Sequence, residues 1–395
     1  MNFYTVKNNV SAAKTFVADD MILTVDIPTA AGSKMLDGYV SLFESEALTR
    51  LTHAGYALGG KADVGEFAID LLGETSYNGA CVVDGVIKNP AAEIIAAGEA
   101  TVALVMDVNG SPRRAAAQSG LVSVKPTYGT VSRFGTIPVA CSGETVSIMA
   151  STAADCREAL SAVSGYDAKD GTSLPEDMRV ADATPIRRVA LLKSMTAGID
   201  ADVKAKLDAC VATLTSNGIE VVEVEDTVIS ASRVAWNTLM SAELCNNVSR
   251  YDGVKYGYRT QNFTNLDELY MNSRTEAFGD LLKTAILFGS ETLSTENYMK
   301  VYDKALRIRR VIVEAFAKLS HDFDAVLMPA CSTLAYTEDA VKADKYMAYT
   351  ENFYTAPASI TGLPAVVVSG VQLVGRAFSE NSLLDVAETL GKEGK

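Results

Sequence analysis

An apolar run from Ala100 to Met106 leads directly into an Asp-x-Asn-Gly turn, and an Arg- and Ala-rich segment follows from Ser111. The run has the length and composition of a buried strand, and the segment after it has those of a helix. A strand, a tight turn and a helix in this order aim the serine hydroxyl and several backbone N–H groups into one space. An acyl-transfer enzyme needs this arrangement, because its nucleophile and the donors that bind an oxyanion must lie together.

Strand and helix signals alternate along the rest of the chain, which predicts an α/β fold. Residues 188–192 and 219–224 have strand patterns and flank an amphipathic helix over 201–217, so we expect a β-α-β unit with parallel strands. The stretch 164–185, rich in Asp, Gly, Thr and Pro, is either a domain linker or a long surface loop. The strands on both sides of it are of the same buried type, so we expect one domain over residues 1–395. Further elements are expected as strands at 56–58, 121–124, 325–328 and 365–368, and as helices at 41–54 and 380–390.

The amino-acid composition indicates where the protein is located in the cell and whether it binds a metal or a cofactor. Of the 395 residues, 48% are hydrophobic, enough for a large core, yet no apolar run approaches the roughly 20 residues of a membrane span. The N-terminus also lacks the order of a signal peptide. The six cysteines form no CxxC pair, there are two histidines, and no segment resembles a phosphate loop. We therefore expect a cytoplasmic protein with no metal and no cofactor.

The net charge of −14 disfavours direct binding to nucleic acid, because phosphate contacts require clustered Lys and Arg. If the chain works on RNA, a partner has to hold the RNA.

Several distinctive sequence motifs are spread along the chain from about Phe16 to the C-terminus. They include Gly60-Lys-Ala-Asp-Val-Gly-Glu-Phe-Ala68, Lys125-Pro-Thr-Tyr-Gly129, Arg250-Tyr-Asp-Gly253 and Thr361-Gly-Leu-Pro364. Together they resemble the amidase-signature family, and within it the A subunits of the glutamine-dependent amidotransferases that convert Glu-tRNA(Gln) or Asp-tRNA(Asn). The resemblance implies an α/β/α layered fold around a large twisted mixed sheet, with the N-terminal helices of the family missing and its C-terminal β segment shortened.

In that family a serine–serine–lysine triad hydrolyses an amide. The resemblance places the nucleophile at Ser111 and the oxyanion hole at the backbone N–H groups of Val108, Asn109 and Gly110.

The other two catalytic positions differ from the family. The second serine, which the family holds on a cis peptide, falls at Ile87, and the lysine falls at Asp19. A serine hydroxyl is a weak nucleophile until a base takes its proton, and Ile87 has no hydroxyl to relay one. Losing a base and a relay costs at least ~10²–10⁴-fold in rate, and more where the residues act as a unit. Neither His53 nor His321 stands in a Ser-His-Asp context, and Cys331 is interpreted as a buried thiol.

The family also holds glutamine through a Tyr, an Arg and an Asp. The resemblance places these roles at Tyr258, Arg309 and Asn352. Arg309 would clamp a carboxylate, whereas Asn352 replaces the acid that should pair with an ammonium group, so we expect weak glutamine recognition.

Three hypotheses about function stay open. The chain is a catalytically impaired homologue that acts as a binding or scaffold protein, or it is an active amidase or glutaminase that supplies ammonia for Glu-tRNA(Gln) amidation through Ser111 with an altered base such as Asp19. The third is a relic whose fold persists without a role. The resemblance implies partners like the B and C subunits of an amidotransferase, with the B-like one carrying the tRNA. Apolar surface left by the missing helices predicts self-association or such a partner.

Overall fold

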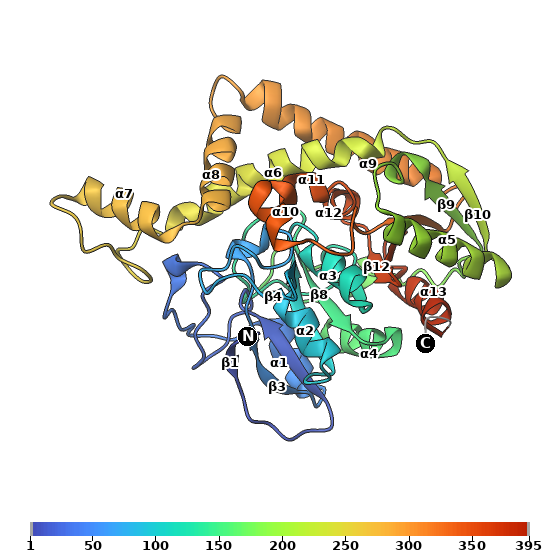
Figure 1. Cartoon of the computed structure of the whole chain (residues 1–395), viewed down its shortest axis with the longest axis horizontal. Coiled ribbons are helices and arrows are strands. Elements are labelled where there is room, and N and C mark those ends of the chain that lie inside the picture. The colour runs from blue at the N-terminus through green and yellow to red at the C-terminus, as the bar shows by residue number, and fades with distance from the viewer. Residues whose placement is uncertain (1–2, 393–395) are drawn as a thin grey trace.

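Eleven strands form one mixed sheet within residues 3–392, the part of the chain that this computed structural model describes (Figure 1). Their order across the sheet is β1-β3-β2-β6-β8-β7-β12-β13-β11-β9-β10, and β4 and β5 form a separate hairpin. The strands are β1 (Tyr4–Lys7), β2 (Thr15–Asp19), β3 (Ala57–Ala62), β4 (Val82–Val83), β5 (Val86–Ile87), β6 (Val102–Asp107), β7 (Val122–Lys125), β8 (Thr145–Ala150), β9 (Arg188–Leu192), β10 (Glu220–Val224), β11 (Ala325–Pro329), β12 (Ala365–Val368) and β13 (Val371–Gly375).

Parallel strands occupy two parts of the sheet and antiparallel strands join them. Strands β3, β2 and β6 run parallel, as do β11, β9 and β10, while β6, β8, β7, β12, β13 and β11 pair antiparallel in turn. In the expected β-α-β unit, Arg188 of β9 pairs with Glu220 of β10 in parallel register. The predicted α/β class with a large mixed sheet is therefore confirmed. Strands from both sides of the 164–185 stretch belong to this one sheet.

Helices cover both faces of the sheet. The α-helices are α1 (Glu46–His53), α2 (Pro90–Ala96), α3 (Ser111–Ser119), α4 (Ala153–Val163), α5 (Ala201–Ser216), α6 (Ser232–Asn247), α7 (Leu266–Ala277), α8 (Asp280–Thr292), α9 (Asp303–Leu319), α10 (Glu338–Ala343), α11 (Met347–Glu351), α12 (Ala356–Thr361) and α13 (Glu380–Lys392). Helices α6, α8 and α9 pack together, and α7 projects away from the body of the molecule (Figure 1).

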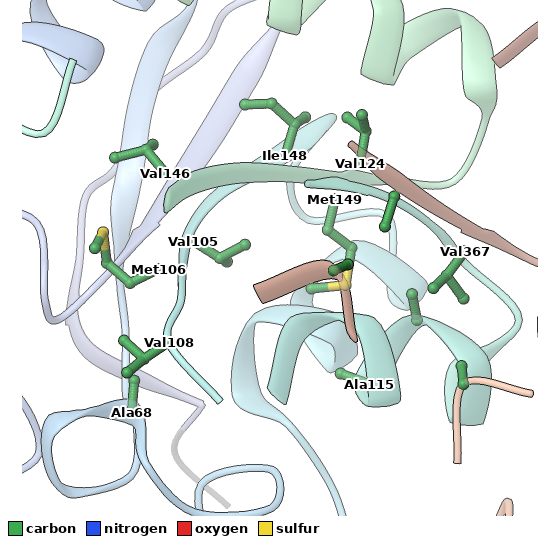
Figure 2. Packing of buried hydrophobic residues seen from close by; sticks show 14 of the residues in the cluster. Ala68, Val105, Met106, Val108, Ala115, Val124, Val146, Ile148, Met149 and Val367 are labelled. Carbon is green, nitrogen blue, oxygen red and sulfur yellow. The ribbon is translucent and has the colours of Figure 1, made fainter. Parts of the chain in front are cut away.

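The core follows the alternation of side chains along the central strands. On β8, Val146 and Ile148 point to one side, and Met149 points to the other, where Ala115 of α3 lies (Figure 2). All four side chains are at most 1% exposed and belong to one continuous hydrophobic cluster. A strand buried on both faces has a near-continuous apolar sequence, as β6 does from Val102 to Met106.

One expected helix is shorter than the sequence pattern suggests. The helix over 41–54 begins only at Glu46, because Ser41 forms a bridge with Val25 and its hydroxyl hydrogen-bonds to the carbonyl of Phe43. Serine side chains that bond to nearby backbone compete with helix in this way.

None of the helices within residues 3–392 is both long enough and apolar enough to cross a membrane.

Candidate functional site

The Ser111 site is built from strand β6, the turn after it and helix α3. Every residue of β6 is buried up to Asp107, and Ser111 is the first residue of α3, with Pro112 next to it. Proline suits the first turn of a helix because its missing N–H would have no partner there. The strand, turn and helix expected from the sequence are therefore all present.

Gly110 makes the sharp bend of the turn. Its φ is +84°, and a Cβ added there would lie 2.3 Å from the Cβ of Thr355, in the segment leading into α12. A side chain at this position would meet both backbone strain and a clash, so the close approach of Thr355 requires glycine.

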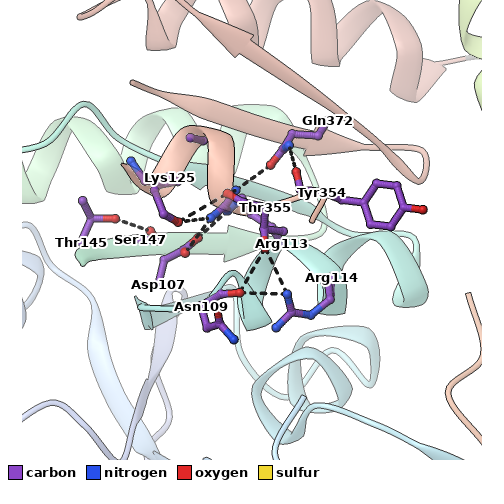
Figure 3. A network of polar contacts seen from close by, with 12 residues as sticks. Asp107, Asn109, Arg113, Arg114, Lys125, Thr145, Ser147, Tyr354, Thr355 and Gln372 are labelled. Atoms are coloured by element: carbon purple, nitrogen blue, oxygen red, sulfur yellow. Dashed lines mark hydrogen bonds and ion pairs between the residues drawn. The ribbon is translucent and has the colours of Figure 1, made fainter. Parts of the chain in front are cut away.

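A buried ion pair fixes the strand end of the turn to the helix. Arg113 contacts both carboxylate oxygens of Asp107, at 2.7 and 3.0 Å, and both side chains are fully buried. Its remaining N–H groups donate to the carbonyl of Thr355, to Gln372 of β13 and to Ser359 (Figure 3). Burial alone would raise the pKa of Asp107, but the charge and hydrogen bonds of Arg113 outweigh it and hold that pKa below its usual value.

Asn109 anchors the turn on its other side. Its carbonyl accepts hydrogen bonds from Arg114 at 2.8 Å and from the Thr355 hydroxyl at 3.1 Å. Its side-chain oxygen accepts from the amide of Asn352 at 2.8 Å, and its side-chain nitrogen donates to the carbonyl of Ile69 at 2.9 Å. The turn is thus held by residues far apart in the sequence.

The backbone N–H groups of Val108, Asn109 and Gly110 have no acceptor among the hydrogen bonds of the described residues. Val108 and Asn109 are at most 1% exposed. Ser111 is 5% exposed, and its hydroxyl likewise has no hydrogen bond within residues 3–392. A buried, rigid set of unpaired donors is able to stabilise an anionic oxygen.

Asp19 lies at the end of β2, and its carboxylate is bound on both oxygens. One accepts from the N–H of Met21 at 3.0 Å and the other from the N–H of Met106 at 2.6 Å. Strand β2 ends here, so the N–H of Met106 on neighbouring β6 finds a side chain instead of a backbone carbonyl. Burial raises the pKa of Asp19 to about 7, against the opposing effect of these two hydrogen bonds.

Sequence reasoning missed a buried lysine next to this position. Lys61 of β3 is fully buried, and its ammonium donates to the carbonyl of Ile22 at 2.7 Å and to the Thr29 hydroxyl at 2.6 Å. It also pairs with Asp20 at 3.1 Å. Burial lowers the pKa of Lys61, although the nearby carboxylate of Asp20 opposes that shift. The sequence did contain a signal for this buried lysine, because it stands between glycine and alanine in an otherwise uncharged strand.

Ile87 is buried in the β4–β5 hairpin, against helix α3. Its N–H donates to the carbonyl of Tyr336 at 2.8 Å, and its carbonyl accepts from Gln118 of α3, also at 2.8 Å. Its apolar side chain helps to line a cavity of about 360 Å³ together with Leu281 and Val341. No hydroxyl stands at this position to pass a proton.

The three expected glutamine-binding residues have separate partners. The Tyr258 hydroxyl donates to Glu276 at 2.6 Å, and Arg309 donates to the hydroxyl and carbonyl of Ser142 at 3.1 and 2.9 Å. Of the three, Asn352 is the one with a hydrogen bond to the turn before Ser111.

The remaining candidates lie in ordinary surroundings. His53 is exposed at the last position of α1, and His321 is exposed after α9. Cys331 is fully buried, and burial raises its pKa to about 12, so it is a protonated thiol near neutral pH.

Comparison with known proteins decides the family. The model of the Amidase family matches residues 19–384. The chain belongs to the amidase family. The A subunit of glutamyl-tRNA(Gln) amidotransferase from Acinetobacter baumannii is 36% identical, over 93% of this chain and 80% of that protein. The corresponding protein of Streptococcus pneumoniae is 34% identical, over 96% and 82%.

Solved structures agree with this amidase-family assignment. The crystal structure of the A subunit of glutamyl-tRNA(Gln) amidotransferase from Thermotoga maritima superimposes with a TM-score of 0.81 at 25% identity, covering 98% of this chain and 86% of that one. Urea amidolyase of Kluyveromyces lactis has a TM-score of 0.80 at 21% identity, over 95% of this chain and 23% of that one, which shows the shared fold alone. The resemblance to the amidase-signature family and the layered fold expected from it are confirmed.

Proposed function

We propose that this amidase-family chain is a homologue of the amidotransferase A subunit that is catalytically impaired and acts as a binding or scaffold protein. The observation that carries the proposal is the state of Asp19, which stands where the family has its lysine. Each of its carboxylate oxygens accepts one backbone N–H group, and within residues 3–392 neither forms a hydrogen bond with the Ser111 hydroxyl.

Two buried lysines near the site have hydrogen-bond partners of their own. Burial lowers the pKa of Lys125 on β7 to about 7, and its Nζ donates to the carbonyls of Pro126 and Leu363 at 3.1 and 3.0 Å. The three N–H donors of Lys61 are matched by Ile22, Thr29 and Asp20, and none of these contacts reaches Ser111. A serine without a proton acceptor attacks a carboxamide poorly.

The second candidate function is an active amidase or glutaminase that supplies ammonia for Glu-tRNA(Gln) amidation through Ser111. Two observations favour it. The unpaired N–H groups of Val108, Asn109 and Gly110 form a donor set suited to an oxyanion, and the pKa of Asp19 is about 7, near the optimum for a general base at neutral pH.

A glutaminase assay separates the two candidates. We expect no ammonia release from glutamine, and no labelling of Ser111 by an activated fluorophosphonate, in the purified chain or in complexes that co-purify with it. The matched control is Ser111→Ala, which removes one oxygen atom. Ammonia release that disappears in Ser111→Ala would refute the hypothesis of impaired catalysis and establish the active enzyme.

A gain-of-function variant tests whether the missing base and relay are the cause of impaired catalysis. The double substitution Asp19→Lys with Ile87→Ser restores both residue types that the family uses. If the missing base and relay are what limits the chain, this variant should label Ser111 or release ammonia above the background of the same variant carrying Ser111→Ala. Folding of the variant is checked by its thermal transition, because both positions are buried.

The proposed partners are proteins like the B and C subunits of an amidotransferase, with the B-like one carrying the tRNA. Their relevance rests on the similarity to proteins named as A subunits. Co-expression with B- and C-like proteins followed by size-exclusion chromatography tests this proposal. A chain that stays a monodisperse monomer alone and in these mixtures would refute the scaffold role.

A further inference from the structure

A cavity of about 250 Å³ lies between helix α9 and the strands β11 and β13, and the residues that line it do not include Ser111 or its neighbours. Thr361 and Leu363, at the end of α12 and just after it, form one side. The opposite wall is a single face of α9, because its residues are spaced three, four and seven positions apart. These residues are Val313, Phe316, Ala317 and Ser320.

Two apolar side chains of the sheet form the floor of this cavity. Val326 of β11 and Val374 of β13 are directly opposite each other in an antiparallel pair, so both side chains point to the same face of the sheet. A Cβ added at the next residue, Gly375, would point the other way, where it would meet Ser379 and Leu383. The helix and the sheet therefore enclose the space with apolar groups on two sides.

The polar side chains that line the cavity have partners of their own. The hydroxyls of Ser320 and Thr361 donate to backbone carbonyls three and four positions earlier in the chain, each at 2.7 Å. At the rim, Arg376 donates to one carboxylate oxygen of Asp324 at 3.0 Å, and the other oxygen accepts two backbone N–H groups next to the start of β9. A polar ligand would give up its hydration for groups that are already engaged, which costs free energy.

The size and lining of the cavity favour an apolar guest over water. A water molecule in a protein interior needs roughly two to four polar partners, whereas an apolar cavity of about 150 Å³ stays dry and binds benzene. This cavity is larger, at about 250 Å³, so it has room for an aromatic ring that carries a short alkyl group. The rim disfavours an organic anion, because Arg376 faces two carboxylates, Asp324 at 3.0 Å and Asp182 at 3.7 Å.

We propose that this cavity is a binding site for a small neutral apolar molecule, about the size of an alkylbenzene. The guest lies between the α9 face and the two valines of the floor, and its binding free energy comes from apolar surface removed from water. The site is separate from Ser111, and it does not depend on whether the chain is catalytically impaired.

The test compares toluene with benzoate, which has the same ring and a negative charge, on the full-length chain. Both are titrated at constant ionic strength, and binding is followed by calorimetry and by the rise in melting temperature. We expect toluene to bind with a Kd of about 0.1–1 mM, an affinity open to a ligand of this size, and to raise the melting temperature. Its binding should have a negative heat-capacity change, the mark of apolar burial. Benzoate should bind at least about tenfold more weakly.

Variants then identify the site. Val326→Phe fills the cavity from its floor, and Ala317→Phe places a ring at its mouth, where the side chain is exposed and folding is not at risk. Each should weaken toluene binding by at least about tenfold. The matched control is Val311→Phe, which adds the same ring to α9 at a position that is 49% exposed and outside the lining, and it should bind toluene as the natural chain does. Ser111→Ala should also leave toluene binding unchanged.

The inference fails if toluene does not bind, if benzoate binds equally well, or if Ala317→Phe binds toluene as tightly as Val311→Phe does. It also fails if Ser111→Ala abolishes toluene binding, because the ligand would then occupy the Ser111 site. Val326 is 5% exposed, so its variant risks misfolding, and in that case Ala317→Phe decides.

Discussion

Replacing Asp19 by asparagine should change how the stability of the fold depends on pH. Burial raises the pKa of Asp19 to about 7 in the folded chain, from a usual value of 3.8. The folded state therefore binds this proton more tightly than the unfolded state does. The stabilisation from the bound proton is fully present below about pH 4 and is lost as the pH rises through about 7.

The size of this stability change follows from the shift in the pKa of Asp19. A difference of about three pKa units corresponds to about 4 kcal/mol, since one unit is worth about 1.4 kcal/mol. Asparagine does not ionise, so the variant should not lose this stability. An amide NH₂ cannot accept a hydrogen bond, so in the variant one of the two N–H groups that bind Asp19, those of Met21 and Met106, loses its acceptor. The variant should therefore be less stable than the natural chain at low pH, and the difference between the two proteins should shrink as the pH rises.

Urea unfolding between pH 5 and pH 8 measures this difference. The chain has one tryptophan, Trp236, which is fully buried, so its fluorescence reports loss of the core around α6. About 3 of the 4 kcal/mol falls in this pH range, and Asp19→Asn should lose that much less stability than the natural chain. As a control, Asp385→Asn removes a carboxylate that is 72% exposed and should leave the pH dependence unchanged. Parallel curves for Asp19→Asn and the natural chain would show that Asp19 ionises in the folded protein as it does in the unfolded one, and the reasoning would be wrong.

Three further predictions concern the turn and the thiol near it. Asp107→Asn leaves the charge of Arg113 without a counterion and should lower the free energy of unfolding by about 3–5 kcal/mol in urea titrations. Gly110→Ala combines a positive φ with a Cβ that meets Thr355, and should cost more than about 1 kcal/mol, by the same assay. Cys331, with its pKa of about 12 and no exposed surface, should react with iodoacetamide at pH 8 only after denaturation, as mass spectrometry would detect.

Local patterns in the sequence predict the helices and strands. They do not predict side-chain contacts between residues that are far apart in the chain. The strand before Ser111 and the helix after it were predictable, because apolar runs, turn residues and helix formers act over a few residues. The bond between Asn109 and Asn352 joins positions 243 residues apart, and no local signal indicates it. The same holds for Asp19, whose carboxylate serves the N–H of Met106 only because β2 ends beside a longer β6.

The contacts that shape the turn do not involve Asp19 or Ile87, where the resemblance places the lysine and the second serine of the family. Arg113 joins Asp107 to Thr355 and to Gln372 of β13, so it ties the turn, α3 and the far half of the sheet together. Removing one partner of such a buried pair costs about 3–5 kcal/mol, a large share of the roughly 5–15 kcal/mol that holds a domain folded. Asp19 and Ile87 contribute nothing to this network. The buried ion pair that holds the turn therefore does not depend on which residues stand at those two positions.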